Sequence, residues 1–112
     1  MSRVDSEFKN RVYEVVSQIP KNKVMAYGQV AAMAGAAYAA WEVGKIAHLG
    51  PPDLPWQRVV DRNGGLARGY PGGMEGHKRD LETEGVVVSD DYQIDLEKHQ
   101  WEPPHKSQNS LL

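Results

Sequence analysis

The stretch "YGQVAAMAGAAYAAWEVGKIAHL", residues 27–49, decides the fold. Its pattern predicts one helix over about residues 28–34 and a second over about residues 37–49. Gly35 can take the left-handed conformation that ends the first helix, and the Gly-Pro-Pro run at 50–52 breaks the second. A pair of alanines in the first helix allows the two helices to approach closely. Two short helices joined at a glycine are typical of a helix-turn-helix.

The second of these helices has two different faces. One face predicts a buried stripe: Ala39, Val43, Ile46 and Ala47. The opposite face carries small residues, polar residues and one tryptophan: Ala37, Ala40, Trp41, Gly44, Lys45 and His48. Small residues let a helix lie close to another backbone, and a lysine suits a phosphate group. Packing against a neighbouring helix of the same chain explains this face equally well, so both interpretations stay open.

The remaining sequence predicts a small α+β domain that is mostly helical. Further elements are expected in five places: an amphipathic helix over 5–18, a strand over 58–60, a glycine-rich shaped loop over 66–74, a helix over 74–85, and a hairpin pairing 86–88 with 92–94. We expect one domain over residues 1–100 and a loose C-terminal tail over 101–112, with Trp101 able to dock.

Composition narrows the functional classes. The 112 residues contain no cysteine, which excludes disulfides, thiolate metal sites and thiol nucleophiles. The net charge of −2 is unevenly spread. Residues 1–79 hold 11 basic and 7 acidic residues, whereas residues 80–112 hold 2 and 8. A basic body suits an anionic ligand, although an ordinary solvated surface fits the same counts. No apolar run has membrane-spanning length and the N-terminus is polar, so we expect a cytoplasmic protein without membrane contact.

No catalytic or metal-binding motif is present. The four histidines, His48, His77, His99 and His105, lack ligand spacing and are interpreted as surface residues. The serines have no base in a recognisable arrangement, and Glu82 and Glu84 fit a solvated helix end. We therefore expect no metal, no cofactor and no catalytic residue.

Aromatic residues supply the positive signal. Four rings sit beside glycine, proline or alanine, where a ring can be exposed: Tyr27, Trp41, Trp56 and Tyr70. Each nucleobase stacked on such a ring contributes roughly 1–3 kcal/mol. Core packing explains any single ring, but the nearby arginines at 58, 62 and 68 favour a base-binding site.

Five motifs occur in a fixed order along the chain: "VMAYGQVAAMAG", "VGK", "PWQRVV", "GYPGG" and "LETEG". In these motifs and their order, over about residues 6–88, the chain resembles the C-terminal domain of O6-alkylguanine-DNA alkyltransferases. Alkyltransferases carry Pro-Cys-His-Arg-Val at the third motif, and their cysteine accepts the alkyl group. Here Trp56 stands at the cysteine position and Gln57 at the histidine position. The chain is thus similar to the alkyltransferase-like proteins, the non-enzymatic branch. Independently, an indole is a poor nucleophile and an amide cannot act as a base.

The resemblance implies a winged-helix-like domain that binds O6-alkylguanine in duplex DNA, flips the damaged nucleotide and leaves it unrepaired. It further implies that the bound protein marks the lesion for nucleotide excision repair proteins. The residues expected at the flipped base are Tyr27, which helps to rotate the nucleotide, Trp56, Arg58, Val59, Tyr70, Pro71, Gly72 and Gly73. The residues expected in the minor groove are Ala36, Ala37, Ala40, Trp41, Gly44 and Lys45. Glu84, which supports the catalytic histidine in the enzymes, keeps a structural role.

One departure from the family concerns the gap that a flipped base leaves. Alkyltransferases fill it with an arginine of the recognition helix, and Trp41 stands at that position here. An intercalating indole would fill the gap by stacking. If Trp41 packs internally instead, lesion binding is weaker. The proline-rich loop before Trp56 also lacks the family's asparagine and is shorter.

Two other functions remain open. A transcriptional regulator could read undamaged DNA with the same helix-turn-helix, although its outward face lacks the asparagine or glutamine that reads base edges. An enzyme with an unrecognised nucleophile is the second alternative. Nothing in the sequence indicates more than a monomer.

Overall fold

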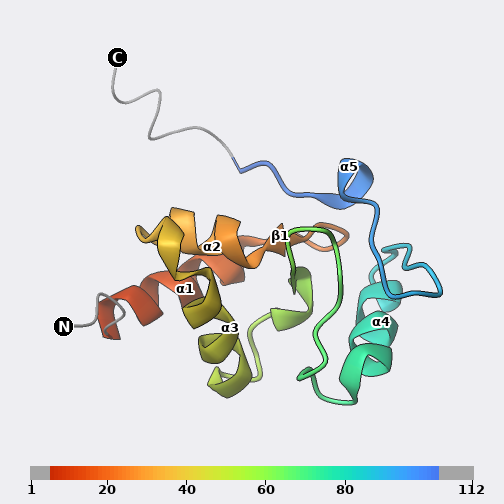
Figure 1. The fold of residues 1–112 in the computed structure, drawn as a ribbon, viewed down its shortest axis with the longest axis horizontal. Coiled ribbons are helices and arrows are strands. Elements are labelled where there is room, and N and C mark those ends of the chain that lie inside the picture. Colours follow the sequence, from red (N-terminus) through yellow and green to blue (C-terminus); the bar gives the residue numbers. More distant parts are fainter. Residues whose placement is uncertain (1–5, 104–112) are drawn as a thin grey trace.

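The computed structural model describes residues 6–103 of the chain. Its elements in order are α1 (Ser6–Gln18), β1 (Met25–Ala26), α2 (Tyr27–Met33), η1 (Ala37–Ala39), α3 (Ala40–Leu49), η2 (Trp56–Arg58), β2 (Val59–Val60), α4 (Gly73–Thr83) and α5 (Leu96–His99). Helices α1, α2 and α3 gather on one side and α4 lies on the other (Figure 1). The mostly helical α+β prediction is confirmed.

The helix-turn-helix forms as the sequence predicts. Helix α2 ends in a turn at Gly35, whose φ of 100° is left-handed and favours glycine. The Arg11 side chain of α1 donates a hydrogen bond of 2.6 Å to the carbonyl of Ala34, so a neighbouring helix satisfies the exposed end of α2. The predicted helix over 37–49 divides into a 3₁₀ turn, η1, followed by α3.

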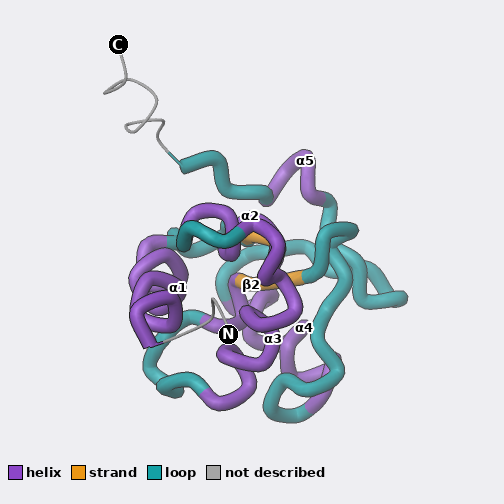
Figure 2. The backbone as a smooth tube through the Cα atoms, turned by 60° about the vertical axis from the view of Figure 1, so that its left-hand side comes forward, coloured by secondary structure: helices purple, strands orange, loops and turns teal. Residues whose placement is uncertain are grey.

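Strands β1 and β2 pair in parallel at the centre of the molecule, with Met25 opposite Val59 and Ala26 opposite Val60. Parallel strands need a crossover connection, and here the helix-turn-helix supplies it (Figure 2). The predicted strand over 58–60 is shorter than expected, because Trp56 to Arg58 form the 3₁₀ turn η2.

The strands separate two hydrophobic clusters. Met25 of β1 and Val59 of β2 pack with α1, α2 and α3, whereas Val60 of β2 and Val24, the residue before β1, pack with α4 and the segment after it. Successive side chains of a strand point to opposite faces, so one short pair contributes to both clusters. The strands therefore connect the helix-turn-helix to α4. The residues between the helix-turn-helix and α4 lie where these two parts of the molecule meet.

The C-terminal part of the described chain differs from the prediction. The expected hairpin is reduced to a single antiparallel bridge, Val88 with Ile94. Helix α5, which was not predicted, is capped at its N-terminus by Asp95, whose side chain accepts a hydrogen bond from the amide of Glu97. Trp101 docks: it packs against the first cluster, and its amide donates to the carbonyl of Val24 at 2.8 Å. Residues 104–112 of the predicted tail lie outside the described residues.

Candidate nucleic-acid interface

A cavity of about 740 Å³ opens between α3, η2 and the loop before α4. Its walls are mostly apolar or aromatic. The lining residues are Tyr27, Gly44, Ala47, His48, Gly50, Pro52, Leu54, Trp56, Gln57, Val59, Ala67, Gly69, Tyr70, Pro71 and His77. A concave site with apolar walls and few polar groups is the usual form of a site for a flat organic ligand.

Trp56 is held rigidly in one wall of this cavity. Its Nε1 donates a hydrogen bond of 2.8 Å to the carbonyl of Pro51, so the proline-rich loop satisfies the indole's one polar group. Its ring meets the edge of Tyr13 at a centroid distance of 6.0 Å. A Cβ on Gly50 would lie 2.4 Å from Cζ2 of the indole, so glycine is required there. The break after α3 thus makes room for the indole.

Tyr70 forms part of the opposite wall. Its ring stacks on His77 with centroids 4.5 Å apart and planes 11° apart. Its hydroxyl donates a hydrogen bond of 2.5 Å to Oδ2 of Asp80. Burial, followed by the hydrogen bond and charge of Asp80 and the charge of Glu84, raises the pKa of Tyr70. The phenol is therefore neutral at physiological pH. Its ring is held in place by the stack on His77 and by the hydrogen bond to Asp80.

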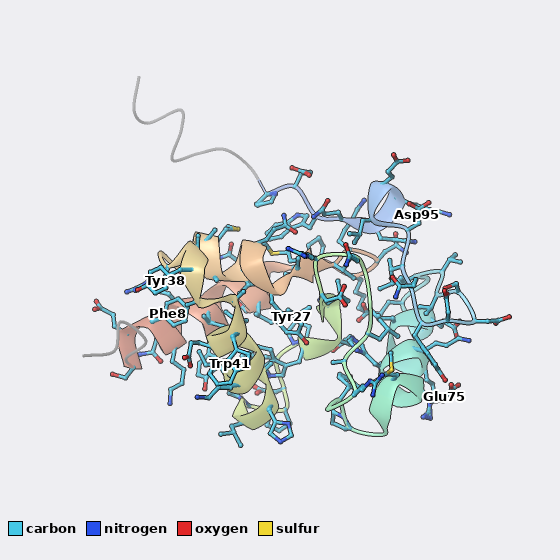
Figure 3. The ribbon with its side chains drawn as sticks, in the orientation of Figure 1. Phe8, Tyr27, Tyr38, Trp41, Glu75 and Asp95 are labelled. Atoms are coloured by element: carbon cyan, nitrogen blue, oxygen red, sulfur yellow. The ribbon has the colours of Figure 1, made fainter. Side chains whose placement is uncertain are left out.

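Tyr27 reaches the cavity from the first residue of α2, between α3 and the central segment (Figure 3). The side chain is partly buried against the first hydrophobic cluster. Burial, with a smaller contribution from the charge of Asp61, raises the pKa of its hydroxyl. The neutral hydroxyl can still donate or accept a hydrogen bond at the cavity.

Glu84 is not the solvated helix end that the sequence predicted. Its carboxylate accepts hydrogen bonds from Nε2 of Gln57 at 2.9 Å and from Nε and Nη2 of Arg58 at 3.0 and 2.6 Å. The side chains of Arg58 and Glu84 are only 13% and 9% exposed. Burial alone would raise the pKa of Glu84, but the bonds from Arg58 and Gln57 outweigh it and the pKa is lowered. The carboxylate of Glu84 therefore has a structural role in the hydrogen-bond network with Gln57 and Arg58, as the resemblance implied.

The outward face of α3 is exposed beside the cavity. Trp41 is 73% exposed, so the interpretation that it packs internally is wrong. Its ring lies 4.6 Å from Nζ of Lys45, and a Cβ on Gly44 would meet no atom within 4 Å. Figure 3 shows Trp41 on α3 and Tyr38 just before it. A second hollow of about 320 Å³ is lined by Trp41, Gly44, Lys45, His48 and Leu49.

The structure brings together most of the predicted base-binding residues. Five line the cavity: Tyr27, Trp56, Val59, Tyr70 and Pro71. Arg58, Gly72 and Gly73 are not among its lining residues, and Arg58 points to Glu84 and to the carbonyl of Ile19 instead. Gly72 and Gly73 shape the turn into α4, with φ of 83° and 71°.

Among the predicted groove residues, Ala36 differs from the expectation of a surface contact. It is 5% exposed and belongs to the first hydrophobic cluster. The others lie at the surface or are half-buried: Ala37, Ala40, Trp41, Gly44 and Lys45. Ala36 follows the turn at Gly35, where the chain still packs into the core before η1 begins.

Two histidines that the sequence analysis placed on the surface are fully buried, His77 and His99. That interpretation is wrong for both, because each ring finds backbone partners at both nitrogens. His48 lies four residues after Gly44 on the same face of α3, a spacing that could have identified it as lining the cavity. No spacing in the sequence marks His77. Within residues 6–103, no three acidic or histidine side chains are grouped to hold a metal ion.

No helix in the described part of the chain is long and apolar enough to cross a membrane.

Comparison with known proteins agrees with this geometry. The family model of the 6-O-methylguanine DNA methyltransferase DNA-binding domain matches residues 7–86. A DNA base-flipping protein of Escherichia coli is 40% identical over 103 residues, which are 90% of this chain and 78% of that protein. Alkyltransferase-like protein 1 of Schizosaccharomyces pombe is 35% identical over 104 residues, covering 87% of this chain and 96% of the relative.

A solved structure extends the likeness to three dimensions. The crystal structure of S. pombe Atl1, in complex with damaged DNA containing O6-carboxymethylguanine, has a TM-score of 0.82 and 32% identity. The match covers 89% of this chain and 99% of the Atl1 chain. The chain therefore belongs to the family of the 6-O-methylguanine DNA methyltransferase DNA-binding domain, and within it to the alkyltransferase-like proteins.

Proposed function

We propose that this protein recognises O6-alkylguanine in duplex DNA by holding the flipped nucleotide in the cavity, and that it transfers no alkyl group. The observation that carries the proposal is the cavity itself, walled by Trp56 and opening beside the exposed face of α3. Its apolar walls suit an alkylated base, which has a flat face for stacking and an added apolar group. The relatives named for base flipping and the Atl1 complex with damaged DNA support the same conclusion.

The absence of alkyl transfer follows from the side chains at the cavity. An alkyl acceptor must be a strong nucleophile near neutral pH, and thiolate is the side chain that meets this demand. The sequence has no cysteine, and Trp56 offers only an indole. The side-chain amide of Gln57 donates a hydrogen bond to Glu84 and cannot act as a base. A nucleotide in this cavity is bound and released unchanged.

The outward face of α3 supplies the DNA contact in this proposal. Its small residues Ala40 and Gly44, together with Ala37 of the preceding η1, allow the helix to approach a DNA backbone closely. Lys45, with its side chain 57% exposed, is available to a phosphate. Trp41 stands one helical turn from Gly44 on the same face, where an apolar wedge can enter a base step. This arrangement fits the minor groove better than base-edge reading in the major groove.

Replacing Gly44 with alanine is expected to separate folding from binding. A Cβ there meets nothing within 4 Å, and alanine is favoured over glycine inside a helix, so we expect the free energy of unfolding to rise by about 0.5–1 kcal/mol. The added methyl group holds α3 away from the DNA, so affinity for every duplex should fall. Urea unfolding and a binding titration check the two effects. A variant that is stabilised and binds DNA normally would show that Gly44 does not face the DNA.

Lesion recognition is tested by titrating two matched duplexes, one with O6-methylguanine and one with guanine, at moderate salt. We expect tighter binding of the lesion, and we expect Trp56→Ala to reduce that preference while guanine binding persists. Mass spectrometry of the protein after incubation with the alkylated duplex should show an unchanged mass. An added alkyl mass would reveal an enzyme. Equal binding of both duplexes would favour a helix-turn-helix regulator of undamaged DNA.

Three further parts of the proposal concern the cell. We propose that the bound protein marks the lesion for nucleotide excision repair, acts as a monomer and works in the cytoplasm. The first part draws on the family resemblance, and co-precipitation of excision-repair proteins with the lesion complex tests it. Light scattering on the free and DNA-bound protein tests the second, and cell fractionation tests the third.

A further inference from the structure

His77 joins the two walls of the cavity. Its Nδ1 accepts a hydrogen bond of 3.0 Å from the amide of Ala67, where the loop carrying Tyr70 begins. Its Nε2 lies 2.8 Å from the carbonyl of Gln57, the residue after Trp56. One fully buried side chain thus ties the Tyr70 wall to the Trp56 wall. The remaining contact, the stack of Tyr70 on the imidazole ring, adds a third link.

These contacts fix the protonation state of the ring. An amide N–H only donates, so Nδ1 must carry no proton, and a carbonyl only accepts, so Nε2 must carry one. A protonated imidazole would place an N–H of Nδ1 against the N–H of Ala67 and lose that hydrogen bond. The geometry is therefore that of a neutral imidazole, and protonation removes the hydrogen bond that holds the loop at Ala67.

The surroundings of His77 favour the neutral form. Burial lowers the pKa of the ring, and the hydrogen bond to Gln57 and the charge of Asp80 offset this only in part. The neighbouring Tyr70 is itself neutral, and its hydroxyl donates to Asp80. Across the cavity the titratable side chains are His48 on α3 and Tyr27 on α2. Glu84 is bound by Arg58 and Gln57.

The loop has little other freedom. A Cβ on Gly76 would lie 2.2 Å from the carbonyl oxygen of Pro71, so the loop rests directly on the first turns of α4. With this contact at its end and the His77 contact at its start, the loop positions Tyr70 at the cavity. Loss of the hydrogen bond to His77 removes the anchor at the start of the loop, whereas the hydrogen bond from Tyr70 to Asp80 and the contact at Gly76 remain.

We propose that neutral His77 is a positioning residue of the lesion site, and that its protonation weakens binding of the flipped nucleotide without weakening general DNA binding. This inference rests on the proposed function. The sign follows from the linkage between protonation and binding. The neutral form binds the lesion, so lesion affinity is complete at neutral pH and falls as the pH decreases through the pKa of His77, which burial holds below the ordinary histidine value of about 6.5.

The test is the ratio of the two dissociation constants, guanine duplex over O6-methylguanine duplex, measured from about pH 7.5 to about pH 5.0. In the wild-type protein we expect the ratio to fall as His77 is protonated, by up to about tenfold, the loss typical of one buried hydrogen bond. His77→Asn keeps an acceptor near the Nδ1 position and cannot be protonated in this range, so its ratio should stay constant. His48→Asn removes the other histidine at the cavity and should retain the wild-type pH dependence.

The outcomes separate this inference from the function on which it rests. A lesion preference that is present at pH 7.5 and unchanged at pH 5.0 overturns the role of His77 alone. A pH dependence lost in His48→Asn but kept in His77→Asn overturns it as well. Equal affinity for both duplexes at every pH overturns the proposed function. Should His77→Asn not fold, imidazole-nitrogen NMR of the wild-type protein decides: the Nδ1 signal must show an unprotonated nitrogen whose protonation coincides with the loss of lesion preference.

Discussion

Replacing Glu84 with alanine is expected to lower the free energy of unfolding by about 3–5 kcal/mol. Removal of one partner of a buried ion pair leaves the other charge without compensation, and the Arg58 side chain is only 13% exposed. The Gln57 amide loses its acceptor at the same time. A domain of this size is stable by about 5–15 kcal/mol in total, so the loss is a large part of it. Urea denaturation monitored by circular dichroism measures the change.

Glu82, two residues earlier in α4, provides the matched control. It is exposed, and we expect Glu82→Ala to change stability by less than about 0.5 kcal/mol. The double variant Arg58→Met with Glu84→Leu removes both charges and should recover much of the loss. An equal, small effect of Glu84→Ala and Glu82→Ala would show that the network contributes little.

The same network has a pH signature with a defined sign. The native pKa of Glu84 is lowered by Arg58 and Gln57 against the effect of burial. The contribution of Glu84 to the free energy of unfolding is therefore complete above its unfolded pKa of about 4.3. It is lost as the pH falls through the native pKa of Glu84. Wild-type stability should converge toward that of Glu84→Ala in strong acid.

Replacing Trp41 with alanine is expected to weaken binding of the O6-methylguanine duplex by about 1–3 kcal/mol, roughly 5- to 150-fold. Under the proposed function, flipping leaves an orphaned partner base and a gap in the stack, and the indole fills that gap. The side chain is 73% exposed and its ring contacts the ammonium group of Lys45, itself an exposed residue, so the fold should lose almost nothing. Fluorescence anisotropy with both duplexes measures the effect.

Two comparisons make this prediction specific. Trp41→Phe keeps a flat ring and should lose less affinity than Trp41→Ala. Leu49→Ala removes another exposed side chain of α3, one that is 84% exposed and lines the same hollow, and should cost little. Equal losses in Trp41→Ala and Leu49→Ala would mean that the indole adds surface but does not enter the stack.

The helices were predictable because their signals are local. The apolar residues of α1 recur at helical spacing, and Gly35 marks the turn between α2 and α3. The small and polar face of α3 was visible for the same reason, since side chains three and four residues apart share a helix face. Boundaries were less certain: the first turn of the predicted 37–49 helix is 3₁₀, and α5 was missed because four residues carry too little periodicity.

The sequence by itself determined that no thiol exists and that an indole and an amide stand in the motif where the alkyltransferases have cysteine and histidine. It could not place Glu84, which meets Arg58 across 26 residues of chain, or His77, which reaches Gln57 across 20. It also could not decide whether Trp41 faces the core or the solvent. Contacts between residues far apart in sequence depend on how the parallel strands join the helix-turn-helix to α4, and no local periodicity encodes that arrangement. Tertiary packing therefore decided which polar residues are buried and which ring remains free at the surface.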